Sequence, residues 1–408
     1  MAVTLLLTFV VIWLVQGGLA TAGLRPRQSA SPSEGGGVAV AFASPSPLSS
    51  TETPTPSLTP AVPPEPGAML IDLPSARIAF ASDHAGDHKD RIYVYEVQPG
   101  QHWLTPLSGI QYQLSQPKPG QPDLDGPILG PLAVPVDETQ ERAWWPEWCD
   151  GNRSLLFEGG DRQSESFQTI YTTAYNAAET GAPRPLSWSD FPMLGVPRCA
   201  NRSSLALASA SLDGESGNWQ LHSFNLHEPD DPNLVGDGFL PFGGYASFSG
   251  DDSWLVLMHK EKATDQAYRL LQFKWSDPRE TVDLPLAQGV YSAMYPSISP
   301  LTGEVAYACE LQPETTRELG SWGLCLQDVN GQSFRVLEQL GLTTGLRQGF
   351  NRFHVFTPRW SADGRWIAYA SPKDGDWDIY LYLVEKDIEF NLTQALTGDQ
   401  FHPSWSKP

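Results

Sequence analysis

The sequence predicts an all-β protein, and its composition gives the first reason. The 408-residue chain contains 36 glycines and 36 prolines, so turns interrupt it throughout. Its 14 tryptophans, 13 tyrosines and 17 phenylalanines favour strands, because aromatic side chains suit a pleated, half-buried surface. Long helical patterns of apolar residues are scarce. We therefore expect many short strands joined by tight turns.

The second reason is a unit of three predicted strands between residues 356 and 382. The first two strands are Thr357–Ser361 and Trp366–Ala370, and the third is Asp378–Tyr382. Asp363 and Gly364 form the turn after the first strand, since Asp-Gly readily adopts the positive φ of a tight hairpin. Such a unit is too small to bury its own apolar faces, so it should recur along the chain.

The unit does recur about every 50 residues, a period typical of a β-propeller with four strands per blade. Equivalent positions on the predicted first strands are Trp148, Cys199, Phe248, Ile298, Trp360 and Trp405. We expect the tryptophans among them to pack between blades rather than to bind a ligand.

The first copy, which begins at Arg77, lacks a first strand, and the final stretch Phe401–Ser406 supplies one. The prediction is thus a six-bladed β-propeller of four-stranded antiparallel blades, its ring closed by the C-terminal strand joining the N-terminal blade. Leu104 and Thr105 are expected in the outer strand of that first blade.

With these repeats the chain resembles the TolB-type six-bladed β-propeller, whose repeats are also called PD40 or WD40-like. The match covers about residues 75 to 408 and is strongest in PRWSADGRWIAYASPKDGDWDIYLY and IAFASDHAGDHKDRIYVYEV. Related propellers serve as protein-docking domains of the bacterial envelope, as sugar-processing enzymes and as the non-catalytic gate of prolyl peptidases. The resemblance therefore implies the fold and leaves the activity open.

Two further segments precede the predicted propeller of residues 71–408. Residues 1–22 contain the apolar run VTLLLTFVVIWLV, followed by small residues, and are expected to form a signal peptide or a membrane anchor. Residues 23–70 are rich in Pro, Ser and Thr and are expected to be a disordered linker. We expect an exported protein that is periplasmic, extracellular or anchored on the outer face of the cytoplasmic membrane.

The charge of the chain limits its partners. With 26 Lys and Arg against 47 Asp and Glu, the net charge is −21, which argues against nucleic acid as a partner. Contact with a membrane is expected only through the N-terminal segment. We expect a monomer.

Four cysteines allow two disulfides in three possible pairings. The repeat register favours one of them. Cys309 and Cys325 fall on one hairpin of the fifth blade, while Cys149 and Cys199 fall on the first strands of neighbouring blades and can face each other. The predicted bonds are 149–199 and 309–325.

The loops that lead into the first strands are the candidate binding rim, because they should converge on one mouth of the channel. Two long insertions, residues 106–143 and 327–355, could widen that face, and Arg347 and Arg352 in the second could attract an acidic partner. The alternative for the rim is packing against the next blade. The candidate binding residues are Trp144, Trp145, Phe191, Tyr245, Tyr291, Tyr295, Arg347, Phe350, Arg352, Phe353, His354 and His402.

No catalytic motif occurs: the chain has neither G-x-S-x-G, nor H-E-x-x-H, nor a glycine-rich phosphate loop. The cluster SDHAGDHKD at residues 82–90 and Asp374, Asp376 and Asp378 could hold a metal, but Asp is also an ordinary turn residue, and no metal or cofactor is predicted.

Three functions remain. The first is an exported, non-enzymatic module that binds a protein or peptide. The second is a propeller that binds or cleaves carbohydrate. The third is a structural head on a stalk.

Overall fold

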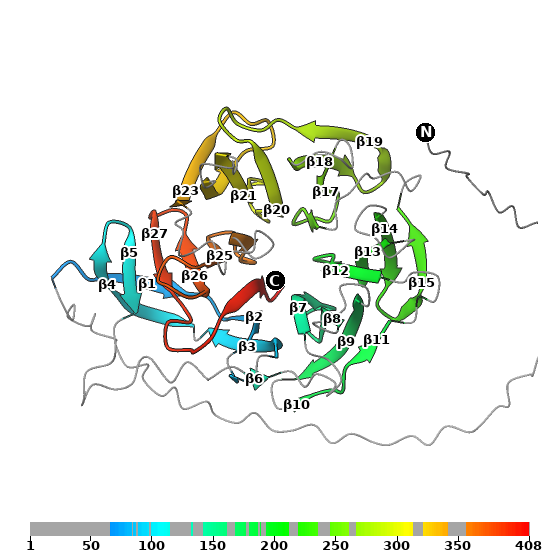
Figure 1. The fold of residues 1–408 in the computed structure, drawn as a ribbon, viewed down its shortest axis with the longest axis horizontal. Coiled ribbons are helices and arrows are strands. Elements are labelled where there is room, and N and C mark those ends of the chain that lie inside the picture. The colour runs from blue at the N-terminus through cyan, green and yellow to red at the C-terminus, as the bar shows by residue number, and fades with distance from the viewer. Residues whose placement is uncertain are drawn as a thin grey trace, which may run out of the picture. The chain divides into compact units, whose positions relative to one another are not determined.

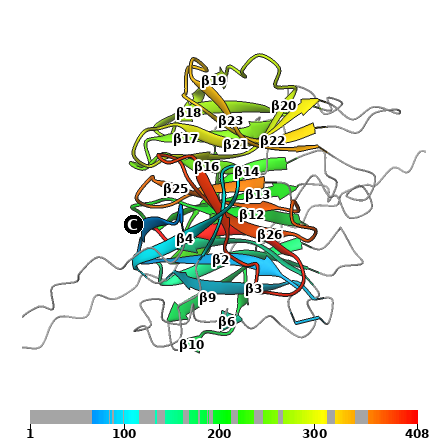
Figure 2. The ribbon, with the colours of Figure 1, turned by 90° about the vertical axis from the view of Figure 1, so that its left-hand side faces the viewer.

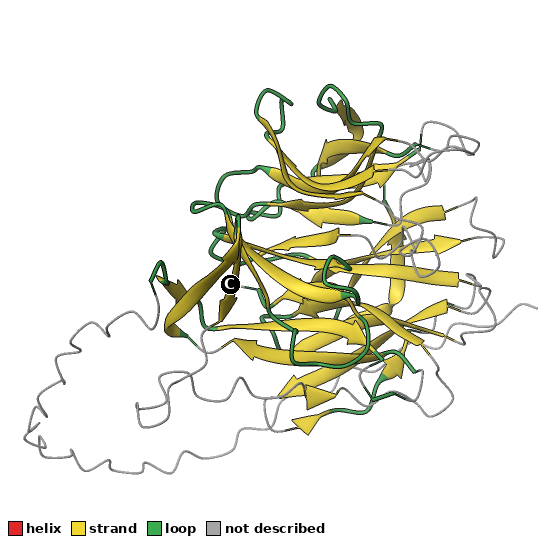
Figure 3. Ribbon diagram, turned by 60° about the vertical axis from the view of Figure 1, so that its left-hand side comes forward, coloured by secondary structure: helices red, strands yellow, loops and turns green. Residues whose placement is uncertain are grey.

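The structure is a computed structural model. It describes residues 66–407 except 84, 87–88, 98, 115–131, 134–141, 161–167, 177–178, 187, 189–192, 212–218, 236–244, 261–266, 313–320 and 342–355. The predicted export segment and most of the predicted linker lie outside the described residues. Every regular element within them is a strand (Figure 3). In this part of the chain, no helix is long and apolar enough to cross a membrane.

The strands form sheets arranged around a central axis (Figure 1). In each sheet as described below, the strand that is named first is called the inner strand. One four-stranded blade contains β28 (Gln400–Trp405), β2 (Ala76–Ser82), β3 (Arg91–Val97) and β6 (Leu132–Ala133). The next sheet contains β7 (Arg142–Cys149), β8 (Ser154–Gly160), β9 (Gln168–Asn176), β10 (Glu179–Thr180) and β11 (Arg184–Pro185).

Three regular four-stranded blades follow, each in simple up-and-down order. The first has β12 (Met193–Cys199), β13 (Leu205–Ser211), β14 (Trp219–Asn225) and β15 (Glu228–Leu234). The second has β16 (Ala246–Phe248), β17 (Trp254–His259), β18 (Arg269–Lys274) and β19 (Asp277–Leu284). The third has β20 (Ser292–Ile298), β21 (Val305–Gln312), β22 (Ser321–Gln327) and β23 (Phe334–Gly341).

The last sheet departs from the predicted pattern because it has seven strands. It joins β24 (Phe356–Trp360), β25 (Trp366–Ser371), β26 (Asp378–Leu383) and β27 (Ile388–Asn391) to β5 (Gln111–Leu114), β4 (Gly100–Ser108) and β1 (Met69–Leu73). The propeller is confirmed, but only five sheets are separate blades of four or five strands. The sixth predicted blade is the β24–β27 part of this larger sheet.

The outer strand predicted for the first blade was wrong. Leu104 lies on β4, which pairs with β1 and β5, and β5 pairs in parallel with β27 of the neighbouring blade. The strand that completes the first blade is the two-residue β6. Outer strands are weakly specified by sequence, since one edge faces solvent and little apolar surface is buried there.

Ring closure by the C-terminal strand is confirmed. β28 pairs antiparallel with β2, with Trp405 opposite Ile78 and Gln400 opposite Ser82. In Figure 2, the red C-terminal strands lie directly against the blue N-terminal strands. The backbone amide of Arg77 donates to Ser406 Oγ at 3.0 Å, which extends the seam beyond the strand. Closure removes the two free edges that an open ring would expose.

The repeated turn and the repeated tryptophan both have the structural roles that the sequence predicts. Gly364 has a φ of 64°, and Asp363 Oδ1 accepts a bond from the amide of Arg365 at 3.2 Å, which closes the hairpin. Trp148, Trp360 and Trp405 are all buried in apolar clusters. They pack between blades, as predicted.

Both predicted disulfides are present. Cys149 and Cys199 join the inner strands of adjacent blades, with 5.5 Å between their Cα atoms. Cys309 and Cys325 join β21 to β22 within one blade, with 5.8 Å between their Cα atoms.

Candidate functional site

A β-bulge recurs on the inner strands wherever the repeat places a proline. The strand register shifts between Trp144 and Glu147, and again at the equivalent positions of four other inner strands. The residue before the proline has a positive φ in each case: 53° at Trp145, 57° at Tyr295 and 53° at His402, for example. Because a bulge inserts one extra residue, it redirects the flanking side chains.

An aromatic cluster, called the aromatic plug here, lies at the axis. It consists of Trp145, Tyr295 and His402, each of which precedes one of these prolines, and of Tyr245, whose equivalent position precedes Ala246 instead. Trp145 stacks on His402 with 3.5 Å between ring centroids, and it lies 5.3 Å from Tyr245 and 5.4 Å from Tyr295. All four side chains are buried. Each comes from a different sheet, so the plug joins four blades across the channel.

The next side chains toward the hairpin end form a second layer, called the axial ring here. One position of every inner strand contributes: the residue between the proline and the tryptophan of the repeat, or its equivalent. These residues are Glu147, Arg198, Ser247, Ser297, Arg359 and Ser404. All six line one cavity of about 70 Å³. The aromatic plug lies next to this ring, because the guanidinium groups of Arg198 and Arg359 lie over the Tyr245 ring at 3.8 and 4.8 Å.

The ring residues also connect each inner strand to the next. Ser247 Oγ accepts the amide hydrogen of Ile298 at 3.0 Å, and Ser297 Oγ accepts that of Trp360 at 3.1 Å. Arg198 Nε donates to the carbonyl of Ala246 at 3.0 Å. The ring is therefore held by bonds between blades, which gives it a fixed geometry.

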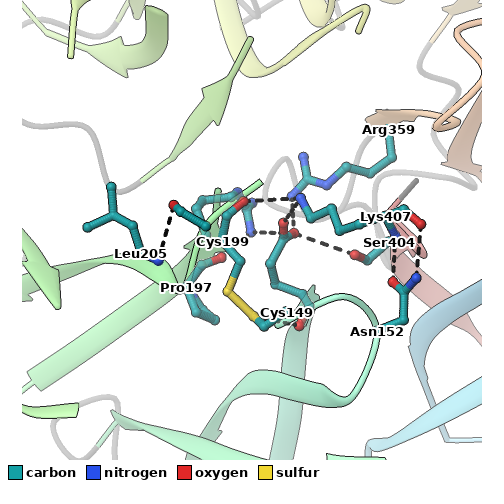
Figure 4. The surroundings of a disulfide bond; sticks show 11 residues. Cys149, Asn152, Pro197, Cys199, Leu205, Arg359, Ser404 and Lys407 are labelled. Carbon is teal, nitrogen blue, oxygen red and sulfur yellow. Dashed lines mark hydrogen bonds and ion pairs between the residues drawn. A yellow bond between two sulfur atoms is a disulfide. The ribbon is translucent and has the colours of Figure 1, made fainter. Parts of the chain in front are cut away.

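Glu147 is surrounded by three cationic side chains. Lys407 Nζ donates to Glu147 Oε1 at 2.7 Å, and Arg198 and Arg359 lie 3.7 and 3.8 Å from Oε2. Figure 4 shows Arg359 and Lys407 converging beside the Cys149–Cys199 disulfide. Burial acts to raise the pKa of Glu147, but the charges of Lys407, Arg359 and Arg198 outweigh it and hold that pKa below its usual range.

Arg198 is the most enclosed of the three cations, with 3% of its surface exposed. Its guanidinium lies over the Tyr245 ring at 3.8 Å, which couples the axial ring to the aromatic plug. Burial and the neighbouring charge of Arg359 lower the pKa of Arg198 to about 10, so the group stays charged at neutral pH. Its Nη2 atom is buried without a hydrogen-bond partner among the described residues.

The predicted rim residues do not line this cavity. Trp145, Tyr245, Tyr295 and His402 form the plug. Trp144 is half-buried and its indole donates to Asp90 at 2.7 Å, whereas Tyr291 is exposed. A binding role for the rim stays a prediction, because much of that face lies outside the described residues: Phe191, Arg347, Phe350, Arg352, Phe353 and His354.

Arg198, Arg359 and Lys407 were not among the candidate residues predicted from the sequence. The signal was present in the repeat itself: the position before Trp148 and its equivalents carries two arginines, a glutamate and three serines over the six copies. In a closed ring with an inner strand from every blade, equivalent positions must form one layer.

A second buried charge cluster lies away from the axis, between β23 and β27. Lys373 Nζ lies 3.1 Å from Glu338 and 2.5 Å from Glu389, and Tyr369 donates to Glu389. The carboxylates of Glu338 on β23 and Glu389 on β27 thus already have partners within the cluster. The cluster therefore links these two outer strands. In the described part of the chain no group of three His, Cys, Asp or Glu side chains could hold a metal. Asp83 accepts the backbone amide hydrogen of Asp399, and Asp378 accepts the hydroxyl hydrogen of Thr393, so both carboxylates have partners in other segments.

Comparison with known proteins supports the architecture alone. No protein-family model and no curated protein matches the chain. Among solved structures, TolB from Acinetobacter baumannii matches with a TM-score of 0.55 and 12% identity, over 82% of this chain and 67% of that one. A chain of the nidogen/laminin complex matches with a TM-score of 0.50 and 9% identity, over 81% and 98%. The fold is a TolB-like β-propeller.

Proposed function

We propose that this TolB-like propeller is a non-enzymatic module that binds a protein or peptide outside the cytoplasm. The observation that supports this most is the shape of the axial cavity. It has a volume of about 70 Å³ and lies next to the aromatic plug, so it suits the tip of a partner rather than a whole substrate. A chain of similar fold in a nidogen/laminin complex supports a protein partner.

Export is proposed from the two disulfides together with the apolar N-terminal run. Structural disulfides persist in oxidising compartments and are rare in the cytosol. Peptide mapping of the native protein without reductant should recover both bonds. Free thiols at all four positions in protein isolated from its native host would contradict export.

A soluble library of random peptides with free C-termini, affinity-selected on the full chain and read by mass spectrometry, tests the binding function. We expect recurrent peptides whose enrichment is lost when Arg198 is replaced. A parallel polysaccharide panel, read by binding and by release of reducing sugar, tests the carbohydrate alternative. Sugar turnover without peptide enrichment would overturn the proposal.

A further inference from the structure

The axial cavity carries a local excess of positive charge, although the chain as a whole has a net charge of −21. Arg198, Arg359 and Lys407 face a single carboxylate, Glu147. The charges of Arg198 and Arg142 both act on Glu158, and burial raises the pKa of Glu158 to about 7, so Glu158 and Arg142 together add no net negative charge. Buried charge is costly unless it is paired, so the two uncompensated cations favour an anion in the cavity.

The hydrogen-bonding groups of the cavity point to the same ligand. Arg198 Nη2 is a buried donor that no described residue satisfies. Ser247 and Ser297 each accept a backbone amide, so in the described structure their hydroxyl hydrogens remain for another acceptor. Trp360 and Trp405 also line the cavity, and their indole nitrogens are buried without a hydrogen-bond partner in the described structure. A ligand must therefore supply acceptors, as an oxyanion does.

The size of the cavity restricts which oxyanion fits. A water molecule needs roughly 10–15 Å³ of such volume, so 70 Å³ admits on the order of five waters, or a carboxylate with its adjoining atoms. The four buried rings of the aromatic plug pack together next to the axial ring, so a chain cannot pass along the axis. Five of the six ring residues are buried, so the end of a peptide can reach them more easily than a side chain from the middle of a chain.

We propose that the axial ring is a carboxylate-binding site, which takes the free C-terminal carboxylate of a bound peptide. This inference rests on the proposed peptide-binding function and names its recognition element. Arg198 and Lys407 bind the carboxylate through charge-assisted hydrogen bonds, and Ser247 and Ser297 donate to it. Glu147 keeps the cations in place when no ligand is bound.

Three small probes test the proposal on the full, oxidised chain: N-acetyl-triglycine, its C-terminal amide, and N-acetyl-glutamate capped as the α-amide. Binding is read from the NMR signals of the Trp360 and Trp405 indole N–H groups. We expect the free acid to shift both signals and the amide to bind at least about tenfold more weakly, because the charge-assisted bonds are lost. The capped glutamate, whose carboxylate is on a side chain, should also bind more weakly than the acid.

Two variants and one control locate the site. Arg198→Gln should abolish binding of the acid. Lys407 is half-buried, so the fold should tolerate its replacement more easily, and Lys407→Gln should weaken binding of the acid about tenfold. Lys386→Gln removes an exposed lysine from the turn between β26 and β27 and should change nothing. Circular dichroism confirms that each variant is folded.

Several results would overturn the carboxylate site. The first is that the acid shifts neither indole N–H signal, and the second is that the amide binds as tightly as the acid. The third is that folded Lys407→Gln binds the acid as tightly as the wild type. Equal affinity for the capped glutamate would overturn the choice of a chain end. If the acid binds as expected but no library peptide is enriched, the proposed function fails while the carboxylate site stands. If library peptides are enriched and amidation of their C-termini does not weaken their binding, the proposed function stands and the carboxylate inference fails.

Discussion

Replacement of Glu158 by glutamine should make the protein less sensitive to alkaline pH. Glu158 is buried on β8, and its Oε2 accepts the amide of Val196 at 3.3 Å. Burial raises the pKa of Glu158 from 4.5 to about 7, and the bond from Val196 and the charges of Arg142 and Arg198 only partly oppose it. The native protein therefore binds more protons than the unfolded chain between these values, and stability falls as pH rises through that window.

The size of the effect follows from the two pKa values. The difference between 4.5 and about 7, at about 1.36 kcal/mol per pKa unit, corresponds to a loss of about 3 kcal/mol by pH 8. Glutamine cannot ionise, so Glu158→Gln removes this loss. The free energy of unfolding of the variant, relative to the wild type, should increase by about 3 kcal/mol between about pH 4.5 and pH 8.

Urea unfolding, followed by tryptophan fluorescence at several pH values, measures this difference directly. Glu280→Gln is the matched control, because it removes an exposed carboxylate from the edge strand β19. A difference between Glu158→Gln and the wild type that does not change with pH would refute the reasoning. A difference that changes in the opposite direction would do the same.

Three further changes test other parts of the structure. A chain that ends at Asp399 lacks β28. Because replacing the buried Trp405 by alanine should alone cost about 3–5 kcal/mol of stability, this truncated chain should unfold at a much lower temperature than the full chain. An unchanged midpoint of thermal unfolding would contradict ring closure. Replacing Cys149 and Cys199 together by alanine opens a loop of 50 residues and should lower the free energy of unfolding, measured with denaturant, by about 4 kcal/mol. An unchanged free energy of unfolding would argue against the disulfide. Glu147→Gln should increase the affinity for N-acetyl-triglycine, because a competing carboxylate is removed; weaker binding by the folded variant would count against the site.

The sequence predicted those features that the repeat imposes on every blade. The tryptophan positions, the strand that closes the ring and both disulfide pairs follow from register, because equivalent residues of neighbouring blades lie side by side. Leu104 was misplaced because its strand, β4, joins the sheet of a neighbouring blade through β5 instead of continuing its own blade. Register alone says nothing about such edge contacts.

The candidate site was harder to predict because its chemistry is spread over the whole ring. Arg198, Ser247 and Arg359 lie about 50 residues or more apart, and none belongs to a local motif. Their meeting depends on the bulges before Pro197 and Pro358, which set where the inner strands direct their side chains. Lys407 lies beyond the last strand, where the repeat gives no register.

Ring closure also determines when the carboxylate site comes into existence during folding. The bond from Arg77 to Ser406 spans 329 residues, and that from Lys407 to Glu147 spans 260. Bringing such distant segments together costs about 5 kcal/mol of chain entropy, so closure should be a late step, after hairpins within single blades have formed. A ligand that needs Arg198 and Lys407 together binds only the closed ring. It would therefore slow opening of the propeller much more than it would accelerate folding, and so lengthen the lifetime of the native state.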